Sequence, residues 1–446
     1  MSTVLYRTES PYVPHAVTTA SPARIAARPD TEQPMRILVP SYRSDPLTGG
    51  QGIYLYYLTQ ALADLGHSVD VASGPPYPEL DPRVGLIKLP SLDLYARPKS
   101  WGGFPAFPIN DVRGPIDIYE YLSHIAGNFP EPYTFGVRLA RYMRGRERDY
   151  DVVHDNQTLT RGLLDLQRRG MPIVGTIHHP ITMDKRIAVA AAETFGLKLL
   201  TAHWYGFLGM QKKVARRLQH FTVCSNSTKR DAARDFKLDA ERLHYVPLGV
   251  DTRIFRPMPN VQRADNLIIA TASADVPLKG LIYLIEAYAT LLAEHPSLQL
   301  LVIGRLRDGS TKNRLSTLGL LDRVKFKSGL SREDLAVAYA RATMLVSPSV
   351  YEGFGFPAAE AMACGTPVIA TTGGSLPEIV GDAGILVPTQ DSHALASAIS
   401  SLLTEPQRRA EFSLRGRERI LQNFTWENSA REAVKIYRRA AMHADN

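Results

Sequence analysis

From residue 35 onward the chain alternates between short apolar runs and longer segments with helical spacing. Short apolar runs bounded by turn residues are typical of strands buried in parallel sheets, and the segments between them have the period of amphipathic helices. The strands predicted in the first half are 35–40, 67–72, 152–154, 173–177, 221–224 and 245–247. Those predicted in the second half are 267–270, 300–303, 324–327, 344–346, 368–370 and 385–387. The pattern predicts an α/β protein with two doubly wound, Rossmann-like domains that face a cleft at the carboxyl ends of their strands.

Three segments interrupt this alternation. Residues 1–34 are rich in Pro, Ser, Thr and Ala and have no sustained period, so we expect a mobile extension there. Residues 74–132 are dense in Pro and aromatic side chains, which predicts long loops. The sequence PLGVDTRIFRP is interpreted as a linker. The predicted domains are therefore 35–250 and 251–426.

Composition narrows the class of partner. The net charge of +8 and the pI near 9.3 allow a nucleic acid, an anionic membrane or an anionic substrate, and equally a generally basic surface. The basic residues are spread along the chain without a nucleic-acid-binding motif, so no nucleic acid partner is expected. No apolar run reaches the roughly 18 residues of a spanning helix, and the start of the chain lacks a signal pattern. Cys224 and Cys364 fall in different halves, so a disulfide is not expected and a cytoplasmic location is predicted.

The stretch 347–388 is the most informative part of the chain. It reads SPSVYEGFGFPAAEAMACGTPVIATTGGSLPEIVGDAGILVP and follows an apolar run. A polar loop carries Glu352, Gly353 and Gly355, and a proline then opens a helix that contains Glu360. Two carboxylates therefore flank a glycine-rich loop and a helix N-terminus.

This arrangement suits a sugar nucleotide, which has hydroxyls at both ends and an anion in the middle. Glycines let backbone N–H groups approach a ligand, and a helix N-terminus attracts a diphosphate, so Gly353, Phe354 and Gly355 are expected at the donor. A carboxylate accepts two hydrogen bonds and can hold vicinal hydroxyls. We expect Glu360, on the helix, to bind the ribose, and Glu352, on the loop, to bind the transferred sugar.

The same stretch also has a dinucleotide-binding pattern. Gly353, Gly355 and Ala358 spell G-x-G-x-x-A after a strand. That pattern requires an acidic residue about 20 positions later, and this chain has Thr371 and Thr372 in that region. A dehydrogenase is therefore the weaker interpretation.

The stretch closely resembles the E-x7-E signature of family 4 glycosyltransferases, and the resemblance extends from Met35 to the C-terminus. It implies the GT-B fold and transfer from a nucleotide diphosphate sugar with retention of configuration. It implies neither a cofactor nor a divalent ion. On base rates a UDP-sugar is the expected donor rather than a GDP-sugar. The resemblance also places the basic amphipathic helix at 427–446 back against the first domain.

Lys279 is the expected cation for the diphosphate. It precedes a predicted helix at 281–293, and a lysine beside a helix N-terminus suits a diphosphate. In the family a Lys-Gly pair at this place neutralises the leaving group, and a Gly-Arg pair slightly earlier assists it. Here Ser273 and Ala274 replace that pair, so another basic residue is needed. Arg305, after the strand at 300–303, is our candidate.

Three further site residues follow from the resemblance. His178, in GTIHHP, is placed near the donor sugar, where a histidine can donate a hydrogen bond to a hydroxyl or to developing charge. Its neighbour His179 is expected to point away. Gly50 belongs to a loop under the diphosphate whose glycines present backbone N–H groups to an anion. Ser328 lies where the family contacts the base.

No metal site is predicted. The single D-x-D triplet, Asp149 to Asp151, precedes a strand and is interpreted as a cap at its start. Around His178 the sequence has no other His, Cys or carboxylate residue at the spacing of metal ligands.

Residues 186–219 combine apolar, aromatic and basic positions. Two interpretations remain open. The segment is either a helix packed on the first sheet with a solvated basic end, which we favour, or an interfacial helix that makes peripheral contact with the inner face of an anionic membrane.

The sequence therefore predicts a retaining hexosyltransferase with an unidentified acceptor: a lipid, a polysaccharide or a small metabolite. Two alternatives are a GT-B sugar-nucleotide epimerase and a non-catalytic carbohydrate- or membrane-binding protein. The loss of the Gly-Arg pair is the best support for the non-catalytic alternative.

Overall fold

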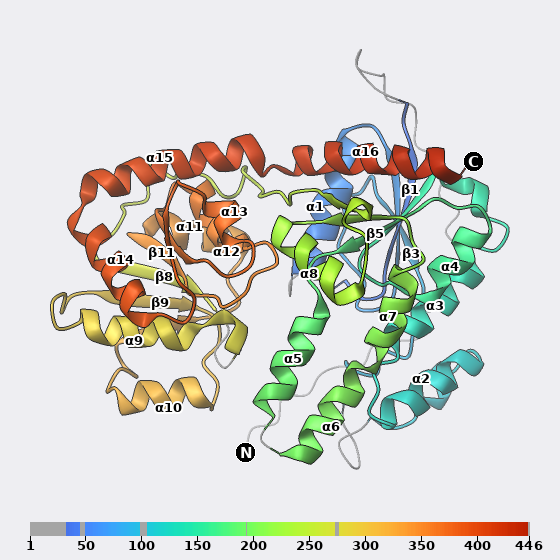
Figure 1. Ribbon diagram of the computed structural model, residues 1–446, viewed down its shortest axis with the longest axis horizontal. Helices are drawn as coiled ribbons and strands as arrows, with labels where there is room; N and C mark the ends of the chain where they lie inside the picture. The colour runs from blue at the N-terminus through green and yellow to red at the C-terminus, as the bar shows by residue number, and fades with distance from the viewer. Residues whose placement is uncertain (1–32, 45–49, 99–104, 193, 273–275, 445–446) are drawn as a thin grey trace, which may run out of the picture. The chain divides into compact units, whose positions relative to one another are not determined.

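Two parallel sheets organise the chain in the computed structural model (Figure 1). The first sheet has the strand order β3-β2-β1-β4-β5-β6-β7 and the second β10-β9-β8-β11-β12-β13. The structure describes residues 33–44, 50–98, 105–192, 194–272 and 276–444. The extension predicted at 1–34 lies almost wholly outside these residues, as do Ser273 and Ala274.

The strands are short, and the inner ones are buried, as expected of apolar runs in a sheet covered on both faces. Those of the first sheet are β1 (Arg36–Ser41), β2 (Ser68–Ser73), β3 (Gly85–Lys88), β4 (Val152–Asp155), β5 (Ile173–Ile177), β6 (His220–Val223) and β7 (Leu243–Tyr245). Those of the second are β8 (Leu267–Thr271), β9 (Gln299–Ile303), β10 (Val324–Lys327), β11 (Met344–Ser347), β12 (Val368–Thr371) and β13 (Ile385–Val387). The prediction of two parallel-sheet, Rossmann-like domains is confirmed.

Helices connect successive strands. In the first half they are α1 (Gly50–Asp64), α2 (Pro115–Ile125), α3 (Glu131–Tyr142), α4 (Arg161–Arg168), α5 (Ile181–Ala191), α6 (Phe195–Trp204), α7 (Leu208–Ala215) and α8 (Asn226–Phe236). In the second half they are α9 (Leu281–Leu291), α10 (Ser310–Thr317), α11 (Arg332–Arg341), α12 (Phe356–Ala363), α13 (Leu376–Val380), α14 (Ser392–Thr404), α15 (Pro406–Asn423) and α16 (Trp426–Ala444). Short 3₁₀ turns are η2 (Ile109–Asp111), η3 (Glu147–Asp149), η4 (Tyr205–Phe207), η5 (Ala240–Arg242) and η6 (Pro277–Lys279).

The strand β1 pairs with a neighbour on each side. In the first sheet Ile37 of β1 pairs with Val69 of β2 and with Val152 of β4. Because all strands run parallel, their carboxyl ends lie at one edge of each sheet. That edge is where ligands bind in such folds, at the point where the strand order reverses.

The prediction of long loops across 74–132 is wrong in part. This region contains the edge strand β3, the helix α2 and the first residues of α3. The strand β3 was missed because its side chains alternate in exposure instead of forming a buried run. Proline suggested a loop at the start of α2, but Pro115 is the first helical residue, a position that tolerates proline.

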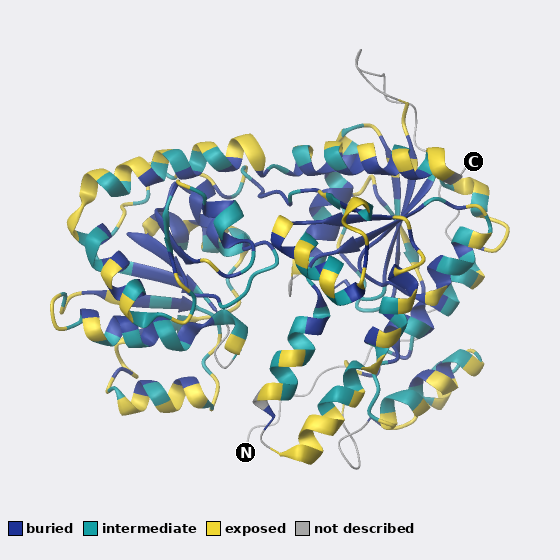
Figure 2. Ribbon diagram, viewed as in Figure 1, coloured by how far each residue is buried: buried dark blue, intermediate teal, exposed yellow. Residues whose placement is uncertain are grey.

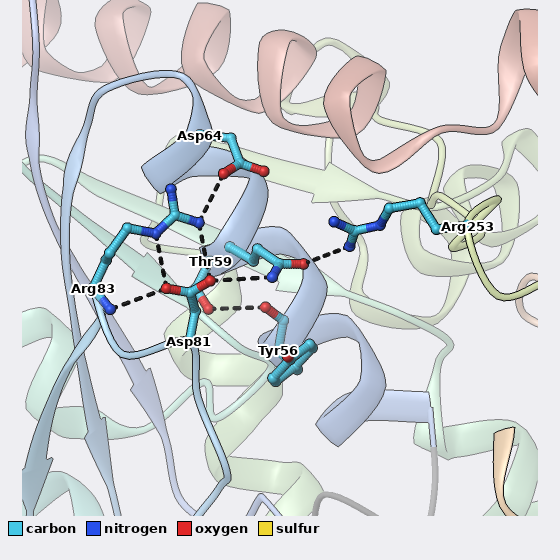
Figure 3. A network of polar contacts seen from close by, with 7 residues as sticks. Tyr56, Thr59, Asp64, Asp81, Arg83 and Arg253 are labelled. Carbon is cyan, nitrogen blue, oxygen red and sulfur yellow. Dashed lines mark hydrogen bonds and ion pairs between the residues drawn. The ribbon is translucent and has the colours of Figure 1, made fainter. Parts of the chain in front are cut away.

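The segment interpreted as a linker contacts α1 through a polar network (Figure 3). Arg253 donates to the Gln60 side chain over 3.1 Å, and Gln60 donates to Asp81 over 3.1 Å. Arg83 also binds Asp81 and thereby holds the pKa of that carboxyl well below its usual range. The network links Arg253 to helix α1, which follows the first strand of the first sheet.

The final helix packs against the first sheet. Helix α16 contacts α1 and the strands β4, β5 and β6. Its first residue, Trp426, stacks on Tyr57 of α1 with ring centroids 5.6 Å apart. These side chains belong to one apolar core that also includes α12.

The segment 186–219 forms three helices rather than one (Figure 2). Helix α7 packs through Leu208 and Val214, as the favoured interpretation required. Helix α6 has no buried residue, and its Phe195 and Leu200 are 76% and 64% exposed, so the same interpretation is wrong for α6. Contact of α6 with a membrane stays a prediction. No described helix is long and apolar enough to cross a membrane.

Candidate functional site

The loop between β11 and α12 is shaped by two glycines. Gly355 precedes α12 with a φ of 97°, a left-handed conformation that glycine adopts without strain. A Cβ atom on Gly353 would lie 2.8 Å from the carbonyl oxygen of His178. The loop therefore approaches the end of β5 so closely that only glycine fits at position 353.

Glu352 and Lys279 form an ion pair at this loop. Lys279 Nζ donates to Glu352 Oε1 over 2.7 Å, and Ser349 Oγ donates to the same oxygen over 2.7 Å. Lys279 ends η6, and the following Gly280 has a φ of 60° and packs against the backbone of Pro348. The structure thus brings together two residues that lie 73 positions apart and that we predicted to bind adjacent parts of one donor.

Glu360 occupies a different environment. It lies inside α12 and is 5% exposed, and burial raises the pKa of its carboxyl to about 7. Arg332, at the start of α11, is 3.7 Å away and opposes this shift, as does Tyr339. A buried carboxylate without a strong cation partner retains acceptor capacity for ligand hydroxyls.

His178 and His179 take different partners. His178, which follows β5, binds the Asn156 amide oxygen through Nε2 at 2.7 Å, and its ring meets Tyr54 edge-on at 4.5 Å. His179 binds Asp184 through Nε2 at 2.6 Å. The two side chains therefore diverge, as expected for neighbouring residues.

The protonation of His178 follows from its surroundings. Burial lowers the pKa of its imidazole to about 3, so the ring is neutral. Asn156 donates its amide to Ser41 Oγ over 3.1 Å, which leaves the amide oxygen to accept from His178 Nε2–H. In a neutral ring the other nitrogen, Nδ1, is then a hydrogen-bond acceptor. The sequence predicted that His178 donates a hydrogen bond to the sugar; in this tautomer Nε2 donates to Asn156 and Nδ1 is an acceptor.

The loop is held by the residues after β6. The Gly353 carbonyl accepts hydrogen bonds from Cys224 Sγ at 3.2 Å and Ser225 Oγ at 3.1 Å. Glu378 of α13 accepts from the backbone N–H groups of Asn226 and Ser227 at the start of α8. These contacts fix the loop beside the carboxyl ends of β5 and β6.

Gly50 begins α1 and lies against Phe356, the first residue of α12. A Cβ atom on Gly50 would be 3.6 Å from the Phe356 ring. Two helix N-termini, each with a partial positive charge, therefore come close at the loop. The preceding Gly49 lies outside the described residues.

Arg305 and Ser328 lie after the carboxyl ends of the neighbouring strands β9 and β10, at the same edge of the second sheet as the loop after β11. Both are exposed, and both follow strands that pair at their ends, Ile303 with Lys327. In the described part of the chain neither forms a hydrogen bond or an ion pair with Glu352 or Lys279.

The comparisons with known proteins agree with this geometry. A family model described as Glycosyltransferase Family 4 matches residues 48–254, and one described as Glycosyl transferases group 1 matches residues 256–419. The MMP alpha-(1->4)-mannosyltransferase of Mycolicibacterium hassiacum is 45% identical over 411 residues, which cover 91% of this chain and 98% of that protein. The chain belongs to glycosyltransferase family 4. It is therefore a hexosyltransferase, and the dehydrogenase interpretation is set aside.

More distant relatives share the fold of this glycosyltransferase. A D-inositol 3-phosphate glycosyltransferase of Thermobispora bispora is 30% identical, covering 88% of this chain and 90% of the relative. The solved sucrose-phosphate synthase from Thermosynechococcus elongatus matches with a TM-score of 0.68 and 27% identity, over 92% of this chain and all of that one. Anabaena HepE in complex with UDP and glucose matches with a TM-score of 0.63 and 18% identity, over 90% of this chain and 98% of that one.

Three residues of the glycosyltransferase site were missed from sequence. Asn156 follows the buried strand β4, and a polar run directly after a buried strand is a signal that could have found it. Ser349 stands three positions before Glu352 and binds it. Arg332 carries no local signal, because only the packing of α11 against α12 brings it to Glu360.

The D-x-D triplet has a structural role. The Asp151 carboxylate accepts from the backbone and the guanidinium of Arg36 at 2.7 Å each, and so joins the start of β4 to that of β1. Among the described residues no group of three or more His, Cys, Asp or Glu is placed to hold a metal ion.

Proposed function

We propose that this glycosyltransferase transfers a mannosyl residue from a nucleoside diphosphate sugar to a saccharide hydroxyl, with retention of configuration. The named activity of its 45% identical relative supports mannose. The observation that carries the donor assignment is the ion pair between Lys279 and Glu352, which lies beside the N-terminus of α12.

The ion pair is suited to exchange partners. Both side chains are partly exposed, 33% for Lys279 and 11% for Glu352, and such pairs contribute only about 0–1 kcal/mol. A bound donor replaces it by two stronger interactions. The diphosphate takes the lysine and the N-terminus of α12, while the sugar hydroxyls take the Glu352 carboxylate.

Glu360 and His178 complete the donor site in this proposal. The buried Glu360 binds the ribose hydroxyls. Ser328 binds the base, and Arg305 binds the phosphate. His178 is neutral, and its Nδ1 accepts a hydrogen bond from a hydroxyl of the transferred sugar. Catalysis then relies on positioning and on stabilising the charge of the leaving diphosphate, which itself receives the acceptor proton on the same face.

The test is calorimetric binding of UDP and GDP, with and without chelator, followed by transfer from the mannosyl derivative of whichever nucleotide binds. Tight binding that is insensitive to chelator and lost in Glu360→Ala is the expected result. Our preference for uridine stays a prediction that the same titration decides. The Glu333→Ala variant, an exposed glutamate on α11, is the matched control.

Other outcomes contradict the proposal in distinct ways. Failure of both nucleotides to bind would support the non-catalytic alternative and give weight to the replaced Gly-Arg pair. Conversion of the donor sugar without any acceptor would support the epimerase. Full activity of a Glu352→Ala variant would refute the role of the ion pair.

A further inference from the structure

The carboxylate of Glu360 has an arginine beside it that forms no hydrogen bond with it. Arg332 Nη2 lies 3.7 Å from Glu360 Oε1, which is longer than a hydrogen bond. Arg332 is the first residue of α11, and α11 packs against α12, which carries Glu360. The two side chains therefore face each other across neighbouring helices without closing the contact.

Two aromatic rings hold the guanidinium of Arg332 at this distance. Its carbon atom Cζ lies 4.9 Å from the ring centre of Tyr57 and 5.0 Å from that of Phe255. Both rings are buried. Tyr57 belongs to α1 and Phe255 to the segment 247–257, so parts of the chain outside the second sheet hold the arginine. A cation is attracted to an aromatic face, and this attraction competes with the pull of the carboxylate.

The position of Arg332 is not favourable for folding. Its Nε is buried and has no hydrogen-bond partner among the described residues. Buried donors normally find acceptors. A cation at the first residue of a helix also lies at the unfavourable end of the helix dipole. Departures of this kind from local rules are expected where a residue serves function, so we looked for a function of Arg332 at Glu360.

The distance of 3.7 Å gives Glu360 the properties that a hydroxyl-binding carboxylate needs. A cation in direct contact would occupy the lone pairs of the carboxylate with its own N–H groups. Without any cation, burial would favour the protonated acid, which accepts fewer hydrogen bonds. An arginine that is near, but held back by two rings, favours the charged form and leaves the oxygens open to a ligand.

Among the described residues, Arg332 is the group with a full charge that acts on Glu360. Two other titratable side chains interact with Glu360, Tyr339 of α11 and Cys364 directly after α12. Burial raises the pKa of both groups, that of Cys364 to about 12, so both are neutral. On α15, Arg417 donates to a carbonyl oxygen at the end of α12 and acts on Cys364 instead. The charge of Glu360 therefore depends on burial and on Arg332.

We propose that Arg332 is a positioning residue that keeps Glu360 as a charged carboxylate whose oxygens stay free for the ribose hydroxyls of the donor. This inference rests on the proposed function, since it concerns the nucleotide of the same donor. Arg332 acts through Glu360 and does not touch the reacting atoms. The ion pair between Lys279 and Glu352 works differently, because in the proposed function the donor displaces that cation.

The proposal predicts a pH dependence of nucleotide affinity with a definite sign. Burial raises the pKa of Glu360 to about 7, and Arg332 opposes this shift. Because the nucleotide binds the charged carboxylate, its Kd should rise about tenfold between pH 8 and pH 6 in the wild type. Without Arg332 the pKa of Glu360 rises further, so the loss of affinity should begin at a higher pH.

The experiment measures the Kd of UDP or GDP, whichever the wild type binds, by calorimetry at pH 6, 7, 8 and 9. Arg332→Met removes the charge and keeps a long side chain against the two rings, whereas Arg332→Lys keeps the charge. Arg146→Met is the matched control, because Arg146 also stacks on a tyrosine, 4.7 Å from the ring centre of Tyr142, but follows α3. Each variant is compared with the wild type at the same pH, which cancels the ionisation of the nucleotide itself.

We expect Arg332→Met to raise the Kd about five- to tenfold over the wild type at pH 7 and less than about twofold at pH 9, where Glu360 is ionised in both proteins. Arg332→Lys should follow the pH profile of the wild type. Arg146→Met should match the wild type at every pH. Thermal unfolding of each variant checks that it is folded.

The contrary results separate this proposal from the proposed function. A loss of affinity that is equal at all four pH values would show that Arg332 acts only through packing, and would overturn the proposal. An unchanged Kd in Arg332→Met would also overturn it, as would a folded Arg332→Lys variant with the profile of the methionine variant. Binding by the wild type leaves the proposed function intact in each case. Failure of the wild type to bind either nucleotide would instead refute the proposed function itself.

Discussion

Two regions of this glycosyltransferase place carboxylates beside a cation, with opposite results. At the donor loop Lys279 contacts Glu352 at 2.7 Å, and both side chains are partly open to solvent. In the cluster after β1, Arg43 stays 3.6 to 3.8 Å from Asp93 and Glu131, and the facing atoms are buried. The pair at the donor loop closes to hydrogen-bond distance. The second cluster does not close, although Arg43 is about as exposed as Lys279, so exposure alone does not decide which pair forms a hydrogen bond.

The difference has a physical origin in the backbone. The donor loop carries Gly353 and Gly355, which let it approach β5 and bring Glu352 to the lysine. In the second cluster Glu131 begins α3 and Asp93 has a φ of 47°, so the backbone sets where each carboxylate lies relative to Arg43. A lysine has a long, flexible side chain that can reach its partner from a 3₁₀ turn.

The largest expected effect comes from removing the lysine of the ion pair at the donor loop. Lys279→Met removes the cation of the leaving group and leaves Glu352 bound to Ser349 alone. We expect kcat to fall about 100- to 1000-fold, the usual cost of losing a group that stabilises transition-state charge. Steady-state kinetics with saturating donor would measure this. Lys312→Met, an exposed lysine on α10, is the control and should change kcat less than twofold. A similar fall in both variants would refute the specific role of Lys279.

A second prediction concerns the pH dependence of stability that Glu360 causes. The pKa of Glu360 rises from 4.5 in the unfolded chain to about 7 in the folded protein, mainly because of burial. Its contribution to stability is therefore complete below pH 4.5 and is lost as pH rises through 7. Glu360→Gln should be more stable than wild type at pH 8, by at most about 3 kcal/mol, and this advantage should vanish at pH 4.

Urea unfolding at the two pH values measures this difference. Glu333→Gln, at an exposed position on α11, serves as the control and should leave the pH dependence unchanged. A Glu360→Gln variant that is equally destabilised at both pH values would show that the carboxylate is ionised and paired in the folded protein.

The smallest expected effect tests how tightly the donor loop approaches β5. Gly353→Ala places a Cβ atom 2.8 Å from the His178 carbonyl, so the loop must shift. We expect a loss of about 1–3 kcal/mol in stability together with weaker donor binding. Gly209→Ala, in α7 with nothing within 4 Å of its Cβ position, should be neutral or slightly stabilising. Thermal unfolding and nucleotide titration of both variants would decide, and an unchanged Gly353→Ala protein would contradict the close approach.

The sequence predicted most of the scaffold correctly. Strands β5 and β13 were located to the residue because each is a short, mainly apolar run, and β10 was located to the residue from its alternating apolar and charged positions. Strand β7 was placed two residues late, and β3 was missed, since edge strands bury less and lose the apolar signal. Helix α12 begins at Phe356, one residue before the proline that marked it.

The sequence alone determined the fold class, the glycine-rich loop between Glu352 and Glu360, and the membership of the family. Local patterns carry these features, because period, turn chemistry and motif spacing act over neighbouring residues. Only the tertiary structure decided that Lys279 reaches Glu352, that Asn156 sets the tautomer of His178, and that Arg43 and Glu131 face each other unsatisfied. Each of these pairs joins residues far apart in the chain, and only packing of the separate strands and helices brings such residues together.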